Sequence, residues 1–368
     1  MELRINVADF SRGLASTQGI VQKRNTMPIL ANVLIEASED GEVQLIATDL
    51  DIGMRVTGKA EVVQAGAVTV NARALYDIVR ALPAKEATLK RMENNYVEVR
   101  AGRVHYKIIG TAPDEFPSLP ALEDVQFIKL EAAALKEMVD KTFYSVSTDE
   151  TRYNLNGVFF EQTKDGKLAM VSTDGHRLTR IVRGLNVDMG MKEGVILPRK
   201  GLNELRRLAD SGTGTIELGI KGSQAVARHE SVTVVMRLID GTFPDYDQVI
   251  PKETEKKVVL KREEIVEALR RIALVSSDKS HSVKLELFSG SLRISSQNPD
   301  LGEGEEEIPV SYEGGDIHIG FNARYLIEAL VAINTDEVQL GLNDDLSPGK
   351  LNGVGDEDYI CVVMPMRI

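Results

Sequence analysis

The stretch NLNGVFFEQTKDGKLAMVSTDGHRLTRIVR at residues 154–183 decides how the rest of the chain is understood. An apolar run at 158–160 is followed by Asp165-Gly166, which supplies the positive φ that a short hairpin needs. Residues 168–173 then alternate, and Asp174-Gly175 ends the alternation. We predict a strand, a turn, a second strand and a tight corner into a third strand.

The same order of parts occurs twice more, as PILANVLIEASEDGEVQLIATDLDIGMRV at 28–56 and SVKLELFSGSLRISSQNPDLGEGEEEI at 282–308. Aligning the three stretches places Asp49, Asp174 and Gln297 at one position, about 125 residues apart. A chain of 368 residues is also too long for a single ordinary core. The repeat therefore predicts three domains of one α+β fold, with boundaries at 1–122, 127–250 and 257–368.

Each third of the chain also contains two segments with the apolar spacing of an amphipathic helix. Asn71 and Asn322 suit N-cap positions, and Pro198 suits a first helical turn. The six predicted helices span residues 9–25, 71–82, 131–141, 198–210, 261–275 and 322–333.

Composition narrows the class of protein. Apolar residues make up 43% of the chain, as in proteins that bury real cores, and no run approaches the ~20 apolar residues of a membrane helix. The single cysteine, Cys361, excludes an internal disulfide framework and fits a reducing cytoplasm. The five histidines show no metal-ligand spacing, and no nucleotide-binding glycine pattern occurs. We expect no cofactor, no metal and a cytoplasmic location.

The charge is unevenly distributed. The formal net charge is −12, yet the six predicted helices are together positive, so the strands and loops carry the whole negative excess. Amphipathic helices need a charged face in any case, and Lys and Arg are good helix formers. The repeat favours another interpretation, in which all six helices share one side and form a basic surface that contacts phosphates.

Ring geometry agrees with that interpretation. Two copies would present twelve helices, and ~10 Å between helix axes gives a circle ~38 Å across. Removing about 5 Å of helix radius on each side leaves ~28 Å, enough for duplex DNA about 20 Å wide and some water. A basic strand expected around 97–109 and the acidic residues at 300–307 suit a head-to-tail contact, although each could simply be a solvated surface.

The chain resembles a known family, the beta sliding clamps of bacterial DNA polymerase III. The resemblance covers the whole chain and rests on MPIL at 27–30, TDL at 48–50, RYNLNG at 152–157, STDGHRL at 172–178, PRKG at 198–201, DGTFPDY at 240–246, IGFN at 319–322 and VVMPMRI at 362–368. It implies three domains of the DNA-clamp fold, with helices inside and antiparallel sheets outside, closed as a head-to-tail dimeric ring.

The resemblance also implies a processivity factor that encircles DNA and tethers partners through a peptide-binding pocket. Carried over by position, the pocket comprises Leu155, Thr173, Gly175, His176, Arg177, Leu178, Pro244, Val249, Asn322, Tyr325, Leu346, Val362, Met364, Pro365, Met366 and Arg367. Methionines there would give an adaptable apolar surface.

Two further sets of residues are expected at the DNA and at the dimer contact. The DNA set is Arg24, Arg73, Arg80, Lys136, Arg152, Arg199, Lys200, Arg206 and Arg207. The dimer set is Arg103, Tyr106, Lys107, Ile108, Leu274, Val275, Glu305 and Glu306. The implied partners are double-stranded DNA without sequence preference, the polymerase III catalytic subunit, the clamp loader complex, other polymerases and repair proteins carrying a clamp-binding peptide, and a second copy of the chain; no membrane is implied.

Two alternatives belong to other classes of protein. Asp174 and His176, two residues apart, could orient an imidazole as a general base. No Ser or Cys nucleophile motif accompanies them, however, and Asp49 occupies the same corner without a histidine. We therefore interpret the corner aspartate as an acceptor of backbone N–H groups and predict no enzymatic activity. The second alternative is a protein-binding scaffold that does not touch DNA, which the basic helices oppose.

Overall fold

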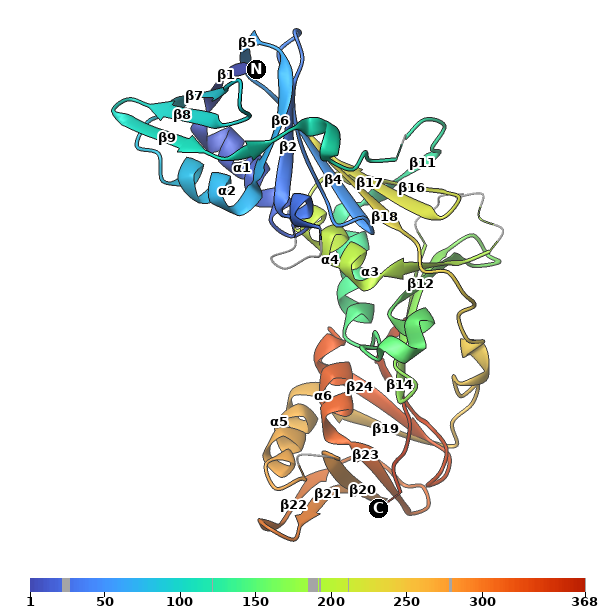
Figure 1. Ribbon diagram of the computed structural model, residues 1–368. Coiled ribbons are helices and arrows are strands. Elements are labelled where there is room, and N and C mark those ends of the chain that lie inside the picture. The colour runs from blue at the N-terminus through green and yellow to red at the C-terminus, as the bar shows by residue number, and fades with distance from the viewer. Residues whose placement is uncertain are drawn as a thin grey trace. The chain divides into compact units, whose positions relative to one another are not determined.

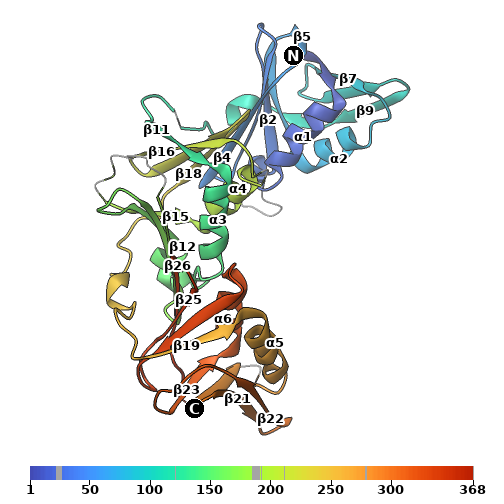
Figure 2. The ribbon, with the colours of Figure 1, turned by 180° about the vertical axis from the view of Figure 1, so that it is seen from behind.

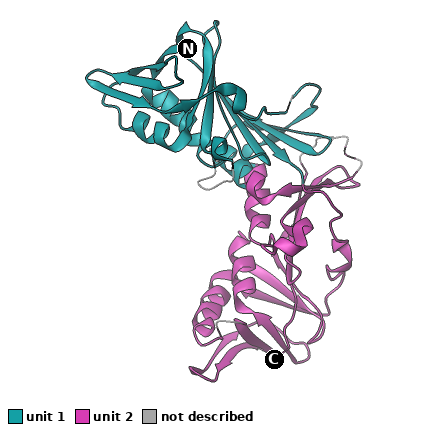
Figure 3. Ribbon diagram, in the orientation of Figure 1, with its two compact units in different colours: residues 1–133, 203–238 teal, residues 134–202, 239–368 magenta. Residues whose placement is uncertain are grey.

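The structure is a computed structural model that describes residues 1–21, 27–120, 122–184, 191, 193–210, 212–277 and 280–367 (Figure 1). The chain divides into two compact units, residues 1–133 with 203–238 and residues 134–202 with 239–368 (Figure 3). Among the described residues no helix is long and apolar enough to cross a membrane.

The first unit contains two antiparallel sheets. The five-stranded sheet has the order β5 (Glu61–Gln64), β1 (Glu2–Asn6), β7 (Glu86–Arg91), β8 (Val97–Ala101) and β9 (Val104–Ile108). The nine-stranded sheet has the order β10 (Gly110–Thr111), β6 (Gly66–Asn71), β2 (Asn32–Ala37), β3 (Glu42–Thr48), β4 (Ile52–Lys59), β18 (Val232–Arg237), β17 (Gln224–His229), β16 (Thr215–Lys221) and β11 (Phe127–Glu131). Helices α1 (Val7–Thr17) and α2 (Ala72–Arg80) lie side by side (Figures 1 and 2).

The second unit repeats this plan. Its eight-stranded sheet has the order β15 (Val195–Pro198), β12 (Gly157–Gln162), β13 (Leu168–Thr173), β14 (Arg177–Arg183), β26 (Asp356–Val363), β25 (Gly349–Gly353), β24 (Glu337–Leu342) and β19 (Lys256–Lys261). Its four-stranded sheet has the order β22 (Gly302–Pro309), β21 (Ser291–Asn298), β20 (Ser282–Phe288) and β23 (Ile317–Asn322). Helices α5 (Arg262–Ala273) and α6 (Ala323–Ala332) pack together, while α3 (Ala132–Phe143) and α4 (Arg199–Leu208) each begin in one unit and end in the other.

The predicted strand–turn–strand repeat is confirmed in all three stretches. The hairpin turns contain Gly41, Gly166 and Gly290, whose φ values are +84°, +81° and +82°. Such values suit glycine because it has no Cβ to clash in the left-handed region. Both faces of β13 are buried, since Ala169 and Val171 are as fully buried as Leu168 and Met170.

The six helices form where the apolar spacing predicts them, with corrected ends. Asn71 and Asn322 do cap α2 and α6, since each side-chain oxygen accepts backbone N–H groups of the first turn. The predicted helix 9–25 is wrong at both ends: Asn6 caps α1, and the helix stops at Thr17 before Gly19. Pro198 ends strand β15, one residue before α4 begins, and so does not lie in a helical turn.

Candidate functional site

The STDGHRL corner is held by a dense set of local hydrogen bonds between β13 and β14. The Thr173 hydroxyl donates to the Arg177 carbonyl (2.6 Å) and accepts the Gly175 N–H (3.0 Å). Asp174 Oδ1 accepts the N–H groups of His176 (2.9 Å) and Arg177 (3.1 Å). Gly175 reaches the required φ of +87° without strain. These bonds fix the path of the chain and leave the His176 side chain exposed.

The first repeat builds its corner in the same way. The Thr48 hydroxyl donates to the Ile52 carbonyl (3.0 Å) and accepts the Leu50 N–H (3.0 Å). Asp49 Oδ1 accepts the N–H groups of Asp51 (3.1 Å) and Ile52 (2.8 Å). Leu50 stands where the second corner has glycine and takes a φ of +79°. Asp174 therefore has a structural counterpart, as predicted for a corner acceptor.

The third corner corrects the alignment of Gln297. Gln297 still pairs within β21, opposite Glu303, and Asn298 is the corner acceptor, taking the Asp300 N–H over 3.0 Å. The sequence spacing agrees with Asn298, because it lies eight residues after the turn glycine Gly290, as Asp49 and Asp174 lie eight residues after Gly41 and Gly166.

Arg177 is the most constrained side chain of the second corner. Only 10% of its side chain is exposed, and Nε donates to Asp174 Oδ2 over 3.0 Å. Nη1 pairs with Glu328 of α6, and Nη2 donates to the Tyr144 carbonyl over 2.6 Å. The guanidinium also lies 4.5 Å from the centre of the Tyr325 ring, a cation–π contact. Arg177 thus joins the corner to α6 and to the end of α3.

The pKa values follow from these contacts. Burial tends to lower the pKa of Arg177, but Glu328 and Asp174 outweigh it and raise that pKa. Burial likewise opposes ionisation of Glu328, yet its bonds to Arg177 and Arg324 lower its pKa. Burial, followed by the charge of Asp174, raises the pKa of Tyr325. Arg177 and Glu328 are therefore charged and paired with each other, and neither is suited to proton transfer near neutral pH.

The C-terminal strand brings the predicted tail to this corner. β26 pairs with β14, so that Val362 faces Leu178 and Cys361 faces Thr179. Beyond the strand, the Met364 N–H donates to the His176 carbonyl (2.8 Å), and the Met366 N–H donates to the Gly320 carbonyl (2.8 Å). The tail is therefore an ordered part of the site up to Met366.

An apolar cluster forms the floor beside the corner. Its buried members are Leu155, Val171, Leu178, Ile196, Phe243, Ile360 and Val362, with Phe159, Ile239, Tyr246 and Ile250 packed against them. The Phe159 and Phe243 rings stack with centroids 5.0 Å apart, and Tyr246 donates its hydroxyl to Glu161. Three of the predicted pocket residues, Leu155, Leu178 and Val362, thus come from three separate segments into one cluster.

The remaining predicted pocket residues have exposed or half-buried side chains. The His176 ring stacks on Tyr325 with centroids 6.4 Å apart, and Asn322 caps the helix that carries Tyr325. Met364 is 37% exposed, Val249 38% and Leu346, in the loop between β24 and β25, 65%. Pro244 and Arg367 are exposed, whereas Pro365 and Met366 are half-buried. An apolar floor under exposed apolar side chains can receive an apolar peptide.

Most of the predicted DNA contacts are exposed but paired locally. Arg73 and Arg80 flank Asp77 on α2, Lys136 pairs with Asp140 over 3.4 Å, and Arg152 pairs with Asp149 over 3.0 Å. The Arg199 guanidinium lies over the Phe143 ring at 5.1 Å, and the Lys200 and Arg206 side chains are exposed. Arg207 donates to Glu204 over 2.7 Å. Arg24 lies outside the described residues. The exposed pairs of Arg73, Arg80 and Arg152 are weak, so these cations stay available to phosphates. Arg207, by contrast, pairs with a buried carboxylate.

The predicted interface residues lie on two strand edges, one in each unit. The basic segment 97–109 is a hairpin of β8 and β9, with Arg103 in its turn, rather than the single strand expected. β9, with Tyr106, Lys107 and Ile108, is an edge strand of the five-stranded sheet, and Lys107 lies over the Tyr96 ring at 4.8 Å. Unpaired edges are ready to accept another strand.

The second edge is acidic. β22, with Glu305 and Glu306, is an edge strand of the four-stranded sheet. Glu306 is already bound by Arg271 of its own chain through two bonds of 2.6 and 2.9 Å. Leu274 is 77% exposed beside this edge, and Val275 is half-buried.

Several side chains of the site were not anticipated from the sequence. Tyr144 and Glu328 hold Arg177, and Phe243 enters the floor. Phe243 had a signal, since its loop TFP matches EFP at 115–117 in the first repeat. Glu328 had only its spacing of four from Arg324, typical of a surface helix pair.

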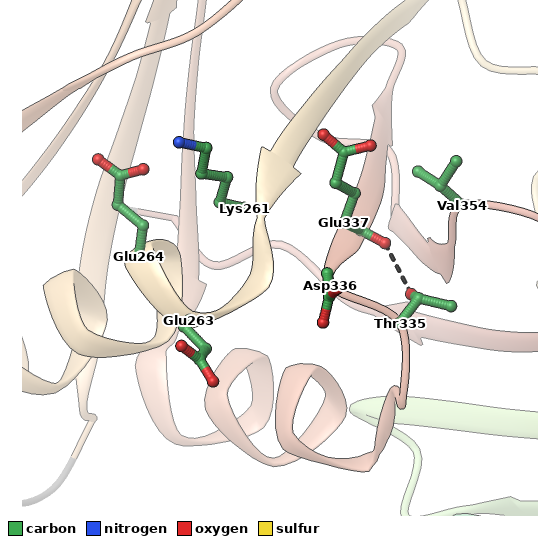
Figure 4. A pocket seen from close by; sticks show the side chains of 7 residues that line it. All are labelled: Lys261, Glu263, Glu264, Thr335, Asp336, Glu337 and Val354. Atoms are coloured by element: carbon green, nitrogen blue, oxygen red, sulfur yellow. Dashed lines mark hydrogen bonds between the residues drawn. The ribbon is translucent and has the colours of Figure 1, made fainter.

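A separate hollow of about 770 Å³ lies between α5 and β24 (Figure 4). Figure 4 shows Glu263 and Glu264 pointing to different sides, and the Thr335 hydroxyl donating to the Glu337 carbonyl over 2.7 Å. Four of its seven lining side chains are carboxylates, which repel phosphates. Among the described residues no group of three or more His, Cys, Asp and Glu is placed to hold a metal ion.

Comparisons with known proteins agree with this architecture over the whole chain. Family models of the N-terminal, central and C-terminal domains of the DNA polymerase III beta subunit match residues 1–120, 129–245 and 247–367. The beta sliding clamp of Pseudomonas putida is 34% identical over 353 residues, 95% of each chain. That of Vibrio cholerae is 33% identical over 371 residues, covering both chains completely.

Solved structures show the same likeness. The sliding clamp of Bartonella birtlesii, bound to griselimycin, has a TM-score of 0.95 and 35% identity over 100% of both chains. The polymerase III beta of Caulobacter crescentus has a TM-score of 0.95 and 33% identity over 100% of both chains. With its repeat, its corner and its tail in place, this chain belongs to the DNA polymerase III beta subunit family, the beta sliding clamps.

Proposed function

We propose that the second corner of this sliding clamp is the pocket that tethers its partners by a short peptide. The observation that carries the proposal is the bond from the Met364 N–H to the His176 carbonyl, over 2.8 Å. It fastens the apolar tail beside the floor of Leu155, Leu178 and Val362. As a member of its family the protein is a processivity factor, and it catalyses no reaction.

The pocket suits a peptide with apolar anchor residues. The stacked Phe159 and Phe243 and the buried Leu178 form a floor, and exposed Met364 is a flexible apolar wall. Arg177 is too fully paired to bind a peptide carboxylate, because Asp174 and Glu328 already hold it. Affinity therefore comes from burial of apolar side chains.

Two copies of the chain close head to tail into a ring around duplex DNA. The support is the pair of free edges, basic β9 and acidic β22, which would extend one sheet across each contact. The contact with DNA is made by Arg24, Arg73, Arg80, Lys136, Arg152, Arg199, Lys200, Arg206 and Arg207. Contacts to phosphates alone read no sequence and permit sliding.

The domain boundaries, the partners and the cellular location belong to the same proposal. Each copy comprises three clamp domains at 1–122, 127–250 and 257–368. The partners are the polymerase III catalytic subunit, the clamp loader complex, and other polymerases and repair proteins that carry a clamp-binding peptide. The protein works on DNA inside the cell, at the replication fork in the nucleoid.

Two experiments test the two halves of the proposal. Single-particle imaging should show a two-protomer ring with an open centre, and a compact particle without a hole would refute encirclement. Titration with a synthetic peptide spanning the clamp-binding segment of a polymerase III catalytic subunit, called here the probe peptide, should show one site per protomer. Griselimycin, which the Bartonella birtlesii relative binds, should compete with it; independent binding of the two would place one of them elsewhere.

A further inference from the structure

A second hollow, of about 320 Å³, lies at the first corner, entirely within the first compact unit. It is lined by residues of the corner 48–53, by the segment 117–120 and by strand β18. This hollow belongs neither to the predicted DNA-contact residues nor to the peptide pocket at the second corner. Its construction, however, repeats that of the peptide pocket.

The strand pairing is the same in both places. β18 pairs with β4 as β26 pairs with β14, so that Val235 faces Gly53 as Val362 faces Leu178. Each corner thus receives a strand from a distant part of the chain along the same edge.

The hydrogen bond that fastens the tail is also duplicated. The Arg237 N–H donates to the Asp51 carbonyl over 2.8 Å, as the Met364 N–H donates to the His176 carbonyl over 2.8 Å. The two corners therefore share one pattern of backbone hydrogen bonds and strand pairing. Only the side chains differ.

The decisive difference is at Gly53, the counterpart of Leu178. A Cβ placed on Gly53 would lie 2.2 Å from Leu119 Cδ2, so the tip of Leu119 fills the space that a side chain of β4 would take. Leu119 also packs against the cluster of Leu34, Ile46 and Phe116. Leu119 is therefore one wall of the hollow, and its tip covers Gly53 as an apolar side chain of a ligand would.

The second linker is arranged differently. Tyr246 follows Phe243 by three residues, as Leu119 follows Phe116. Its hydroxyl donates to Glu161 on β12, and its ring lies beside Phe159 on the same strand, with centroids 6.4 Å apart. This side chain is fastened to β12, and the floor residue Leu178 is supplied by β14 itself.

We propose that the first corner carries a second peptide pocket, and that the chain's own segment 117–120 occupies it through Leu119 as an internal ligand. The inference rests on the proposed peptide pocket at the second corner. A covalently attached segment acts at an effective concentration on the order of millimolar, so a free peptide does not displace it. Each protomer therefore presents one open site, which directs every partner to the second corner.

The test removes the internal ligand and watches the first corner directly. Leu50, 55% exposed at that corner, is replaced by cysteine and labelled with an environment-sensitive dye in both the parent and the Leu119→Ala variant. The natural Cys361 is 1% exposed, and burial raises its pKa to about 11, so it does not compete for the label. Both proteins are then titrated with the probe peptide by dye emission and by calorimetry.

The parent should show one calorimetric event and no change in dye emission. Leu119→Ala should show a second binding event, accompanied by a change in dye emission. The affinity of this second event should be at least about tenfold weaker than that of the first, because Arg237 and Asp51 replace Met364 and His176. Leu122→Ala, in the same linker but outside the hollow, is the matched control and should behave as the parent.

The outcomes separate the two claims. A folded Leu119→Ala protein that keeps a silent dye would overturn the internal-ligand inference while leaving the second pocket intact. If the parent shows no calorimetric binding event with the probe peptide, the peptide pocket itself is contradicted. If Leu119→Ala does not fold, Leu119→Val takes its place, because valine lacks the Cδ atoms that lie over Gly53, and the same presence or absence of dye response decides.

Discussion

Met364 and His176 are joined by a backbone hydrogen bond of 2.8 Å, although most of the second half of the chain separates them. The bond continues the β14–β26 ladder by one step, after Val363 has paired with Arg177. A short apolar tail, which would ordinarily fray, is thereby ordered beside a corner that is itself rigid. The site depends on this junction.

Ending the chain after Val363 should therefore abolish binding of the probe peptide, with affinity reduced at least about 100-fold. The truncation removes the Met364 wall but leaves the strand β26 and the buried Leu178 in place. Calorimetry measures the loss. A chain ended after Met366 is the control and should bind nearly normally, while sedimentation should be unchanged for both. If the chain that ends after Val363 binds the probe peptide as tightly as the parent, the tail is not part of the pocket.

Arg177→Ala should destabilise the second unit by about 3 kcal/mol, because it leaves Asp174 partly buried without its cation and Glu328 with only the exposed Arg324. The same variant should weaken the probe peptide at least about tenfold, since Tyr325 loses its contact and the corner loosens. Urea unfolding and calorimetry give the two values.

Arg324→Ala is the matched control for Arg177→Ala. Arg324 binds the other oxygen of Glu328 over 2.9 Å, but its side chain is 69% exposed. Exposed pairs contribute under about 1 kcal/mol. If the two variants lose the same stability and the same affinity for the probe peptide, Arg177 contributes no more to the site than the exposed Arg324.

Replacing Arg103 and Lys107 together by glutamate should raise the dimer dissociation constant at least about tenfold, because two acidic edges would then face each other. Analytical ultracentrifugation measures the shift. Arg4→Glu with Lys90→Glu makes the same change of charge on inner strands β1 and β7 of the same sheet. If both double variants dissociate alike, the contact is not at β9.

The ion pairs of Glu137 make the stability of the folded protein sensitive to acid. Arg183 donates two bonds to it, over 2.7 and 3.0 Å, and Lys141 lies 2.9 Å away. Arg183 first, and then Lys141, lower the pKa of Glu137 to about 2 from an ordinary value of 4.5, against the opposing effect of burial. The folded state binds this proton less readily than the unfolded state, so the stabilisation is present above pH 4.5 and is lost as the pH falls toward 2.

Glu137→Gln should therefore unfold more easily at pH 7 and lose less stability than the parent between pH 4.5 and 2. Urea titrations at several pH values measure both slopes. Glu150→Gln, at an exposed position, is the control and should follow the parent curve. Parallel acid curves for the parent and Glu137→Gln would mean that another carboxylate dominates acid unfolding.

The local structure of this protein is largely determined by its sequence. Asp165-Gly166 and Asp40-Gly41 turn because glycine tolerates positive φ, and Asn71 and Asn322 cap helices because their side chains reach the free N–H groups of the first turn. Asp49 and Asp174 form their corners by bonds that reach only three residues ahead. Such interactions are encoded within a few residues, so a sequence pattern is enough to predict them.

The tertiary structure alone decided which distant segments meet. No local pattern pairs β26 with β14, brings Phe243 under Leu178, or lets Glu328 and Tyr144 hold Arg177. Nor does any local pattern put Leu119 over Gly53. These contacts form because the apolar faces of all the strands must be buried together, and that requirement involves the whole chain at once.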